Sequence, residues 1–452
     1  MKYKDPEMTE IIETNCLSIE DNKAIQWIED HKEDVVGFLQ ELIQIPSVNP
    51  WFNPKEGESR EAEVQGVIRK RMEGMGAEVK QWEPSAEALA KYAGRPGYYA
   101  DHKFEGRPNQ AAVLKGTGGG KSLLLTGHVD VVPAASGWTM EPFKGERLDG
   151  AVYGRGAVDM KGGIAAMVMA LEAVVKSGYQ LKGDVIVGTV VDEEAGGMGT
   201  LDFVDKGYRA DACILTESTD MKIAPLCRGI LWGKLVITGR SGHIELPQGD
   251  WREGGAVDAI GLARVFMDHF DRLNADWHVR KVHPYLPLPC QVYIAQINAG
   301  EYPTAFANQA ELVFNAQYLP REKDENGLGS RVKAEIEAFV ASVAQTEEWL
   351  RENPPKIEWL IDADCGETPV SDPFVQENLG NLEKHDIKEI IEGVCAHTDL
   401  GWFEELGIPT VVIGAGNPRV AHQNDEFVLE KDLIKLTKYI ATLITHWAQI
   451  SD

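Results

Sequence analysis

The sequence predicts an α/β protein in which a doubly wound, mainly parallel sheet is interrupted by an inserted α+β domain. Three apolar runs, at residues 122–132, 183–191 and 210–215, alternate with segments of helical spacing, and each run leads into polar residues. Such continuous runs are typical of parallel strands that are buried on both faces. Between residues 225 and 365 the expected order changes to βαββαβ, which is typical of a ferredoxin-like sandwich.

The segments before the first apolar run predict two helices and an irregular excursion. Apolar residues at helical spacing favour helices at 24–45 and 61–75, and two prolines follow the first of them. A strand is expected at 77–82. Because residues 84–120 are rich in Pro, Gly and charge, we expect a long excursion there around a short strand at 111–114.

The rest of the chain completes the two domains. A helix at 164–176, closed by Ser177 and Gly178, separates the first two apolar runs. The inserted domain is expected at 225–365, with strands at 229–238, 290–297, 311–318 and 356–362 and helices at 255–273 and 329–349. The main domain, 1–224 and 366–452, then resumes with helices at 372–382, 398–406 and 430–448 and strands at 389–392 and 410–413.

The charge balance limits the classes of partner. The chain of 452 residues has a net charge of -26, from 45 basic and 71 acidic residues. Nucleic acids and anionic membranes require basic surfaces, so neither is expected as a partner. No apolar stretch reaches the roughly 18 residues that a membrane span needs, and the first residues lack the apolar core of a signal peptide. We therefore expect a cytoplasmic protein, whose six scattered cysteines are reduced thiols of the core.

The run at 122–132 ends by presenting His128 and Asp130. Residues i and i+2 of a strand point to the same face, so the two side chains are expected to lie together. A metal-ligating imidazole usually gives its other N–H to an acceptor that orients it, and Asp130 would serve as that acceptor. The alternative is a histidine at a strand end whose hydrogen bonds are satisfied within the fold.

Further polar residues follow at the ends of neighbouring elements: Asp159, Glu193, Glu194, Glu217 and, after the insertion, His422. Taken singly, Asp159 could belong to a plain turn and the paired glutamates to a solvated loop. Together with His128 they form a mixed nitrogen and oxygen set, which is the ligand type of zinc, cobalt or manganese. Converging carboxylates repel one another unless cations neutralise them, so two divalent ions are expected rather than one.

Five motifs carry a resemblance. HVDVVP, GRGAVDMKGG, DEEAGG, LTES and AHQNDE resemble, in order and spacing, the metallopeptidase and deacylase family that includes acetylornithine deacetylase, succinyl-diaminopimelate desuccinylase, aminoacylase and glutamate carboxypeptidase. The resemblance implies a dinuclear metal-dependent amidohydrolase that cleaves the amide of a small N-acylated amino acid or related amine. A dipeptidase or a carboxypeptidase is the alternative within enzymes. A catalytically silent metal-binding homologue is the alternative outside them, although the intact Glu193 argues against silence.

The resemblance also implies roles for the candidate residues. Five side chains would bind two divalent ions, with Zn²⁺ as the first expectation and Co²⁺ or Mn²⁺ as alternatives. These ligands are His128 and Glu217 for one ion, Glu194 and His422 for the other, and Asp159 as the bridge between them. Glu193 would be the general base, and Asp130 the partner that orients His128.

For the inserted domain, the resemblance implies a lid that also forms a homodimer surface. The segment GRSGH resembles the one whose histidine, here His243, helps to stabilise the tetrahedral oxyanion across the dimer. The alternative for His243 is a structural role in a loop.

The chain departs from the family pattern where relatives often recognise a substrate carboxylate. An Asp-x-Arg of the lid reads Asn315-Ala316-Gln317 here, the preceding Asn-x-x-Pro reads TAFA at 304–307, and a usual Gly-Thr-Asp reads HTD at 397–399. A neutral Gln317 cannot make the bidentate, charge-assisted contact that arginine makes with a carboxylate. We therefore expect tolerance of substrates without an α-carboxylate, unless Arg228 or Arg321 supplies the missing charge.

Overall fold

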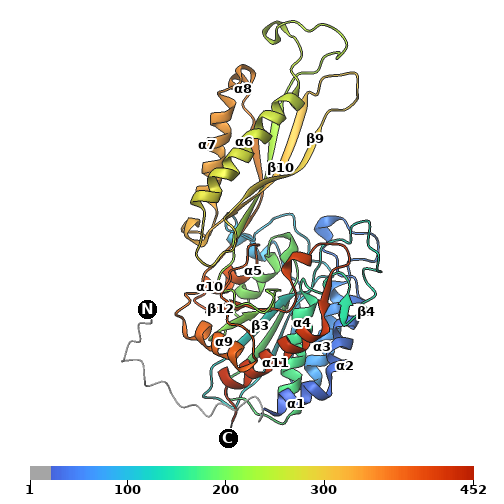
Figure 1. Ribbon diagram of the computed structural model, residues 1–452, viewed down its shortest axis with the longest axis vertical. Coiled ribbons are helices and arrows are strands. Elements are labelled where there is room, and N and C mark those ends of the chain that lie inside the picture. The colour runs from blue at the N-terminus through green and yellow to red at the C-terminus, as the bar shows by residue number, and fades with distance from the viewer. Residues whose placement is uncertain (1–21, 452) are drawn as a thin grey trace.

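The protein consists of a broad body and a second, elongated part that projects from it (Figure 1). The structure, a computed structural model, describes residues 22–451. The prediction that Cys16 is a core thiol lies outside the described residues. None of the helices within 22–451 combines the length and the apolar character that a bilayer crossing requires. The cytoplasmic location stays a prediction.

The body is built on the mixed, mainly parallel sheet that the sequence predicts. The order is β1-β2-β6-β3-β7-β12, in which β6, β3, β7 and β12 run parallel and β1 and β2 pair antiparallel at one edge. Every residue of the two central strands is buried, as their continuous apolar sequences require. The six strands are β1 (Glu78–Trp82), β2 (Asn109–Leu114), β3 (Leu123–His128), β6 (Val185–Val190), β7 (Cys213–Leu215) and β12 (Thr410–Val412).

Helix α4 (Lys161–Lys176) lies at the centre of the body. Its sequence is apolar on nearly all sides because it contacts strand β3 as well as helices α1, α2 and α11. The other helices of the body are α1 (Lys23–Asp30), α2 (Lys32–Ile43), α3 (Glu61–Gly74), α5 (Met198–Asp205), α9 (Pro373–Lys384), α10 (Leu400–Glu404) and α11 (Glu430–Trp447).

The projecting part is the ferredoxin-like unit that the βαββαβ order predicts. Its antiparallel sheet has the order β11-β8-β10-β9, with β8 (Gly229–Thr238), β9 (Val292–Ala299), β10 (Gln309–Tyr318) and β11 (Lys356–Ala363). Alternate residues of β8 are buried, so one face of the sheet is covered, and α6 (Ala259–Arg280) contacts it. In Figure 1, α6 lies beside α7 (Ser330–Ala344), with α8 (Glu348–Glu352) at the far end. The first and last strands are neighbours, since Ile230 pairs with Ala363.

Some expected elements differ in the structure. The helix expected at 24–45 is two helices that meet at His31, whose ring stacks on Trp27 and contacts its carbonyl oxygen at 2.8 Å through Nδ1. The strand expected at 389–392 does not form; an isolated bridge between Ile223 and Ile391 stands in its place. The helix expected at 329–349 ends at Ala344.

The sequence also did not predict a small third sheet of three-residue strands, β13-β5-β4. These are β4 (Glu146–Leu148), β5 (Ala151–Tyr153) and β13 (Phe427–Leu429), and they join the chain after β3 to the C-terminal segment. Short 3₁₀ helices complete the fold: η1 (Pro50–Phe52), η2 (Ala88–Tyr92), η3 (Glu193–Ala195), η4 (Trp251–Glu253), η5 (Pro320–Glu322) and η6 (Pro418–Val420).

Candidate metal centre

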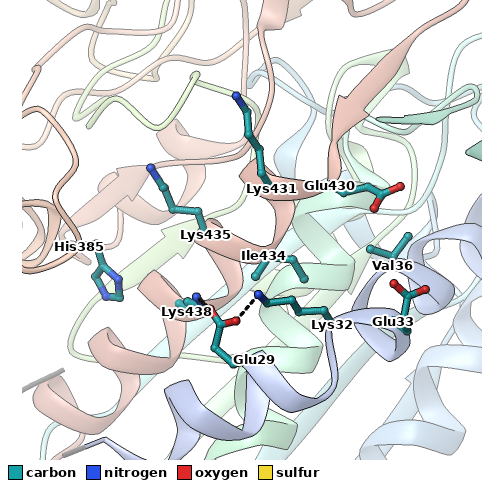
Figure 2. A pocket seen from close by; sticks show the side chains of 10 residues that line it. All are labelled: Glu29, Lys32, Glu33, Val36, His385, Glu430, Lys431, Ile434, Lys435 and Lys438. Carbon is teal, nitrogen blue, oxygen red and sulfur yellow. Dashed lines mark ion pairs between the residues drawn. The ribbon is translucent and has the colours of Figure 1, made fainter. Parts of the chain in front are cut away.

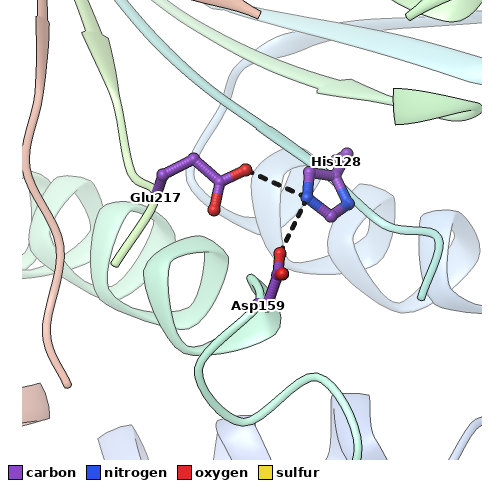
Figure 3. Close-up of side chains that lie close together, drawn as sticks. All are labelled: His128, Asp159 and Glu217. Carbon is purple, nitrogen blue, oxygen red and sulfur yellow. Dashed lines mark ion pairs between the residues drawn. The ribbon is translucent and has the colours of Figure 1, made fainter. Parts of the chain in front are cut away.

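The candidate residues meet where the parallel strands end. His128 is the last residue of β3, and Glu217 follows β7, its neighbour in the sheet. The Nε2 atom of His128 lies 3.0 Å from Oε1 of Glu217 and 3.2 Å from Oδ1 of Asp159 (Figure 3). Asp159 comes from the turn before α4. Three segments that are far apart in the sequence thus converge on one imidazole nitrogen.

A second half of the site shares Asp159 with the first. The Nε2 atom of His422 lies 3.1 Å from Oδ2 of Asp159 and 3.3 Å from Oε2 of Glu194. Asp159 therefore turns one carboxylate oxygen to each histidine, which is the arrangement of a bridging ligand. The side chain of His422 is 52% exposed whereas that of His128 is fully buried, so the second half of the site faces solvent.

The chemistry of these donors fits two divalent ions. Nε2 of His128 and Oε1 of Glu194 are buried without a hydrogen-bond partner, and a metal would supply one. Burial, together with the charge of Asp159, raises the pKa of Glu194 and raises that of Glu217 to about 7. Divalent cations would relieve this repulsion, and imidazole with carboxylate is the ligand set of zinc, cobalt or manganese.

Glu193 and Glu194 are adjacent in the sequence, but their side chains lie near different histidines. Asp192, just before them, adopts a left-handed conformation with φ of 73°, so the chain turns sharply into η3. Oε2 of Glu193 then lies 3.7 Å from Nε2 of His128, while Glu194 faces His422. Burial raises the pKa of Glu193 well above its usual value.

Asp130 lies just past the end of β3, buried beside His128. Its backbone oxygen lies 2.9 Å from Nδ1 of His128, and its carboxylate Oδ1 lies 3.6 Å from the same atom. A carbonyl oxygen only accepts, so Nδ1 carries the proton and Nε2 is left for a metal. The carboxylate accepts the backbone N–H groups of Glu193 and Glu194, each at 3.3 Å, and the side chain of Asn49 at 2.8 Å. That the carboxylate itself orients His128 stays a prediction.

A buried ionic network holds Asp192, and sequence reasoning missed it. Arg107 donates to Oδ1 of Asp192 at 3.0 Å and to both carboxylate oxygens of Glu61, at 2.6 Å and 3.0 Å. His102 contacts the other oxygen of Asp192 at 2.8 Å. Both Arg107 and His102 come from the 84–120 excursion, whose composition gave no sign of this role.

A second buried pair ties Asp159 to the C-terminal segment. Glu426 accepts the backbone N–H groups of Val158 and Asp159, at 2.8 Å and 3.2 Å, and forms an ion pair with Arg155. Because Glu426 lies four residues after His422, these contacts hold the segment that carries His422 against the turn that carries Asp159. The motifs GRGAVD and AHQNDE contained both partners, although not their pairing.

His397 is a further residue of the site that the sequence analysis noted only as a departure. Its Nε2 atom lies 3.8 Å from Oε1 of Glu193, whereas Nε2 of His128 lies 3.7 Å from Oε2 of the same carboxylate. Its Nδ1 atom lies 2.9 Å from the carbonyl oxygen of Asp364. Burial lowers the pKa of His397 to about 4. Glu193, His397 and Asp399 form a third group of side chains that lie close together. The carboxylate of Asp399 also accepts a hydrogen bond from the Thr200 hydroxyl at 2.6 Å.

The two candidate residues of the inserted unit lie elsewhere. His243 is exposed in the segment after β8, where it bridges to Ala305, and no contact between described residues joins it to the cluster. Gln317 lies on β10 and accepts from Nη1 of Arg228 at 2.7 Å. Arg228 is fully buried and Arg321 donates to the Val282 carbonyl at 3.1 Å, so both arginines already have partners.

A surface groove of about 450 Å³ is separate from this cluster (Figure 2). Residues of α1, α2 and α11 line it, and none of them belongs to the cluster. Lys32 and Lys438 both form ion pairs with Glu29. We assign no function to this groove.

Comparison with known proteins decides the family. A sequence profile described as peptidase family M20/M25/M40 matches residues 124–446. The chain belongs to this family. It is therefore a metal-dependent hydrolase that acts on amide bonds, as the motifs predicted, and its family has a dinuclear metal site. Fold and activity class are thus confirmed.

Two relatives match nearly the whole chain. Both are described as N-formyl-4-amino-5-aminomethyl-2-methylpyrimidine deformylase. The relative from Halalkalibacterium halodurans is 28% identical over 446 residues, which cover 94% of this chain and 96% of the relative. The relative from Bacillus subtilis is 29% identical over 440 residues, which cover 93% of this chain and 96% of the relative.

Solved structures share the fold. The Saccharomyces cerevisiae di-peptidase Dug1p superposes with a TM-score of 0.71 over 96% of this chain and 99% of its own, at 15% identity. A Bacillus subtilis protein described as a dinuclear metal binding peptidase of the M20 family gives a TM-score of 0.58 over 92% of this chain and 98% of its own, at 16% identity.

Proposed function

We propose that this protein is a dinuclear zinc deacylase that removes a small acyl group, formyl first, from a neutral N-acylated amine. The observation that carries the proposal is Asp159, which presents one carboxylate oxygen to each of two histidines. We further propose that the catalytic domain comprises 1–224 and 366–452 and that 225–365 is the lid. Co²⁺ or Mn²⁺ would suit the same donors.

The proposed ligands divide between the two halves described above. His128 and Glu217 would hold one ion, Glu194 and His422 the other, and Asp159 would bridge them. When bound, two divalent ions supply Lewis acidity that polarises an acyl carbonyl and acidifies a water molecule.

Glu193 is the proposed general base. It is buried, 3.7 Å from Nε2 of His128, and its pKa is raised by burial, so its carboxylate accepts a proton readily. It would take the proton of the attacking water and pass it to the leaving amine nitrogen. Asp130 would support this step, since it binds the backbone N–H of Glu193.

The preference for a neutral amine rests on Gln317 and Arg228. Relatives of the family often place arginine where this chain has Gln317, and here Arg228 donates to Gln317 and to the carbonyl oxygen of Cys395. Gln317 is neutral, and both terminal nitrogens of Arg228 already donate to protein oxygens, so only the buried Nε of Arg228 is left without a partner. The two relatives that match nearly the whole chain are described as deformylases of a pyrimidine compound, and that compound bears no carboxylate.

A homodimer through the lid is part of the proposal. The segments that link β8 to α6 and β9 to β10 lie at the end of the lid farthest from the body (Figure 1), so His243 would act in the site of a second copy. Strand β9 is an edge of its sheet, and an exposed apolar edge calls for a partner. Exposed apolar residues on β9 and in these two segments are Ile244, Leu246, Tyr293, Ile297 and Tyr302.

The dimer is tested by complementation. Glu193→Ala and His243→Ala chains, each inactive alone, should regain activity when mixed, because a hybrid dimer holds one intact site. Light scattering would give the oligomeric state. No recovery despite proven subunit exchange would leave His243 acting within its own chain or not at all.

The substrate class is tested with metal-loaded protein and four matched amides. These are the N-formyl aminomethylpyrimidine, its N-acetyl analogue, N-acetylornithine and a dipeptide. We expect kcat/KM for the formamide to exceed that for either carboxylate-bearing substrate by at least about 100-fold, or about 2.7 kcal/mol. Cleavage of the dipeptide or acetylornithine with no cleavage of the formamide would refute the proposal.

A further inference from the structure

His397 presents an unsatisfied nitrogen beside the reacting groups. Its side chain is 7% exposed, and its Nε2 atom is buried without a hydrogen-bond partner. A buried polar atom without a partner costs about 1–3 kcal/mol, so such an atom is expected to meet a partner when the protein works. The atom points toward Glu193, with 3.8 Å between Nε2 and Oε1.

The hydrogen bond on the other side of the ring decides what this partner can be. Nδ1 of His397 lies 2.9 Å from the carbonyl oxygen of Asp364, and a carbonyl oxygen cannot donate. Nδ1 therefore carries the proton of the neutral ring, and Nε2 carries a lone pair. Burial lowers the pKa of His397 to about 4, which keeps the ring neutral near pH 7. Nε2 of His397 can thus accept a hydrogen bond but cannot donate one.

We propose that His397 is a specificity-determining residue that accepts a hydrogen bond from an N–H donor on the amine half of the substrate. This rests on the proposed function, because Glu193 marks where the leaving amine sits. A carboxylate or carbonyl oxygen at this position would face a lone pair and be disfavoured. His397 and the Gln317–Arg228 pair then select in the same direction, for a neutral amine that carries a second nitrogen.

An aminopyrimidine meets this requirement by its connectivity. In 4-amino-5-aminomethyl-2-methylpyrimidine, the amino group is on the ring carbon next to the one that bears the aminomethyl arm. The leaving nitrogen and the amino nitrogen can therefore lie side by side. Glu193 would serve the first and Nε2 of His397 the second, as the 3.8 Å between their two atoms allows.

The test compares two formamides that differ only in this donor: the N-formyl aminomethylpyrimidine and the same compound without the 4-amino group. The readout is the ratio of their kcat/KM values in wild type, His397→Ala and His397→Gln. We expect wild type to prefer the amino compound by about 10-fold or more. The ratio should fall to within about twofold of one in His397→Ala and recover in part in His397→Gln, whose amide oxygen can accept.

Two controls make the result specific. His385→Ala removes another, partly buried histidine, which contacts Thr442 at 2.9 Å away from the cluster, and should keep the wild-type ratio. Metal content should stay at the wild-type level in His397→Ala. A loss of metal there would overturn the proposal, because it would make His397 a ligand. An unchanged ratio in His397→Ala would overturn it as well.

A binding measurement separates this proposal from the proposed function. Calorimetry of the two product amines with wild type and His397→Ala does not depend on turnover. If wild type cleaves neither formamide, the deformylase function fails. A preference for the amino product that disappears in His397→Ala would still support the hydrogen bond, and equal binding of both products by wild type would refute it.

Discussion

Removing Arg107 should lower the stability of the fold and loosen the turn at Asp192, which carries Glu193. In Arg107→Met, Glu61 and Asp192 lose the buried guanidinium that binds them at 2.6–3.0 Å. Breaking a buried ion pair by removing one partner costs about 3–5 kcal/mol. Burial already raises the pKa of Glu61 to about 8, so this carboxylate can take up a proton and limit the loss. We therefore expect the lower end, about 3 kcal/mol.

The size of this effect can be measured by thermal unfolding. In a chain of 452 residues, whose unfolding entropy is about 0.95 kcal/mol/K, about 3 kcal/mol corresponds to a fall of roughly 3 °C in Tm. The double variant Glu61→Leu with Arg107→Met should recover part of the loss, because an apolar pair replaces a buried carboxyl group that has lost its partner. The turn at Asp192 carries Glu193, so Arg107→Met should also lower kcat by about 10-fold with KM unchanged. A Tm within about 1 °C of wild type, with full turnover, would refute this reasoning.

Three further outcomes are expected. Glu193→Gln should keep its metal but lose about 10²-fold or more in kcat; near-full turnover would remove Glu193 from the mechanism. Elemental analysis should find about two divalent ions per chain and about one in His422→Ala, because only the solvent-facing half loses its imidazole; no affinity for zinc or cobalt would contradict the metal site. Burial lowers the folded pKa of His385 to about 4, below its unfolded value of about 6.5, so its stabilising effect is lost as the pH falls from 6.5 toward 4. His385→Gln should reduce the loss of stability between pH 7 and pH 5 by about 1 kcal/mol, after allowance for partial exposure; identical pH profiles would show that His385 titrates normally.

The sequence was most informative where one local pattern determines the structure. The buried runs before His128 and Glu217 could only be central strands, and parallel strands bring their ends to the same edge. The strand order of the inserted unit likewise follows from βαββαβ. The different directions of Glu193 and Glu194 follow from the left-handed Asp192, which turns the chain into η3.

What the sequence could not supply are contacts between distant polar residues. Arg107 lies 85 positions from Asp192, in a segment without periodicity, and its charge is equally compatible with a solvated loop. The lone pair of His397 depends on the Asp364 carbonyl, which no residue pattern reveals. The strands of the third sheet are three residues long, too short for an alternation to stand out.

The pairing of β8 with β11 makes the inserted unit an exchangeable module. Ile230 and Ala363 are strand partners, and Leu226 bridges to Glu367, so the chain leaves the body and returns to it through a two-stranded neck. Partners in a sheet are about 5 Å apart, a gap that a two-residue hairpin turn closes. The body could therefore be produced as one continuous chain without the lid, and a lid from another member could be grafted at the same neck. The inserted unit also packs on the body beyond the neck, where Trp51 meets Trp232 and Leu215 and Val412 join its buried cluster, so a grafted lid would have to reproduce these contacts.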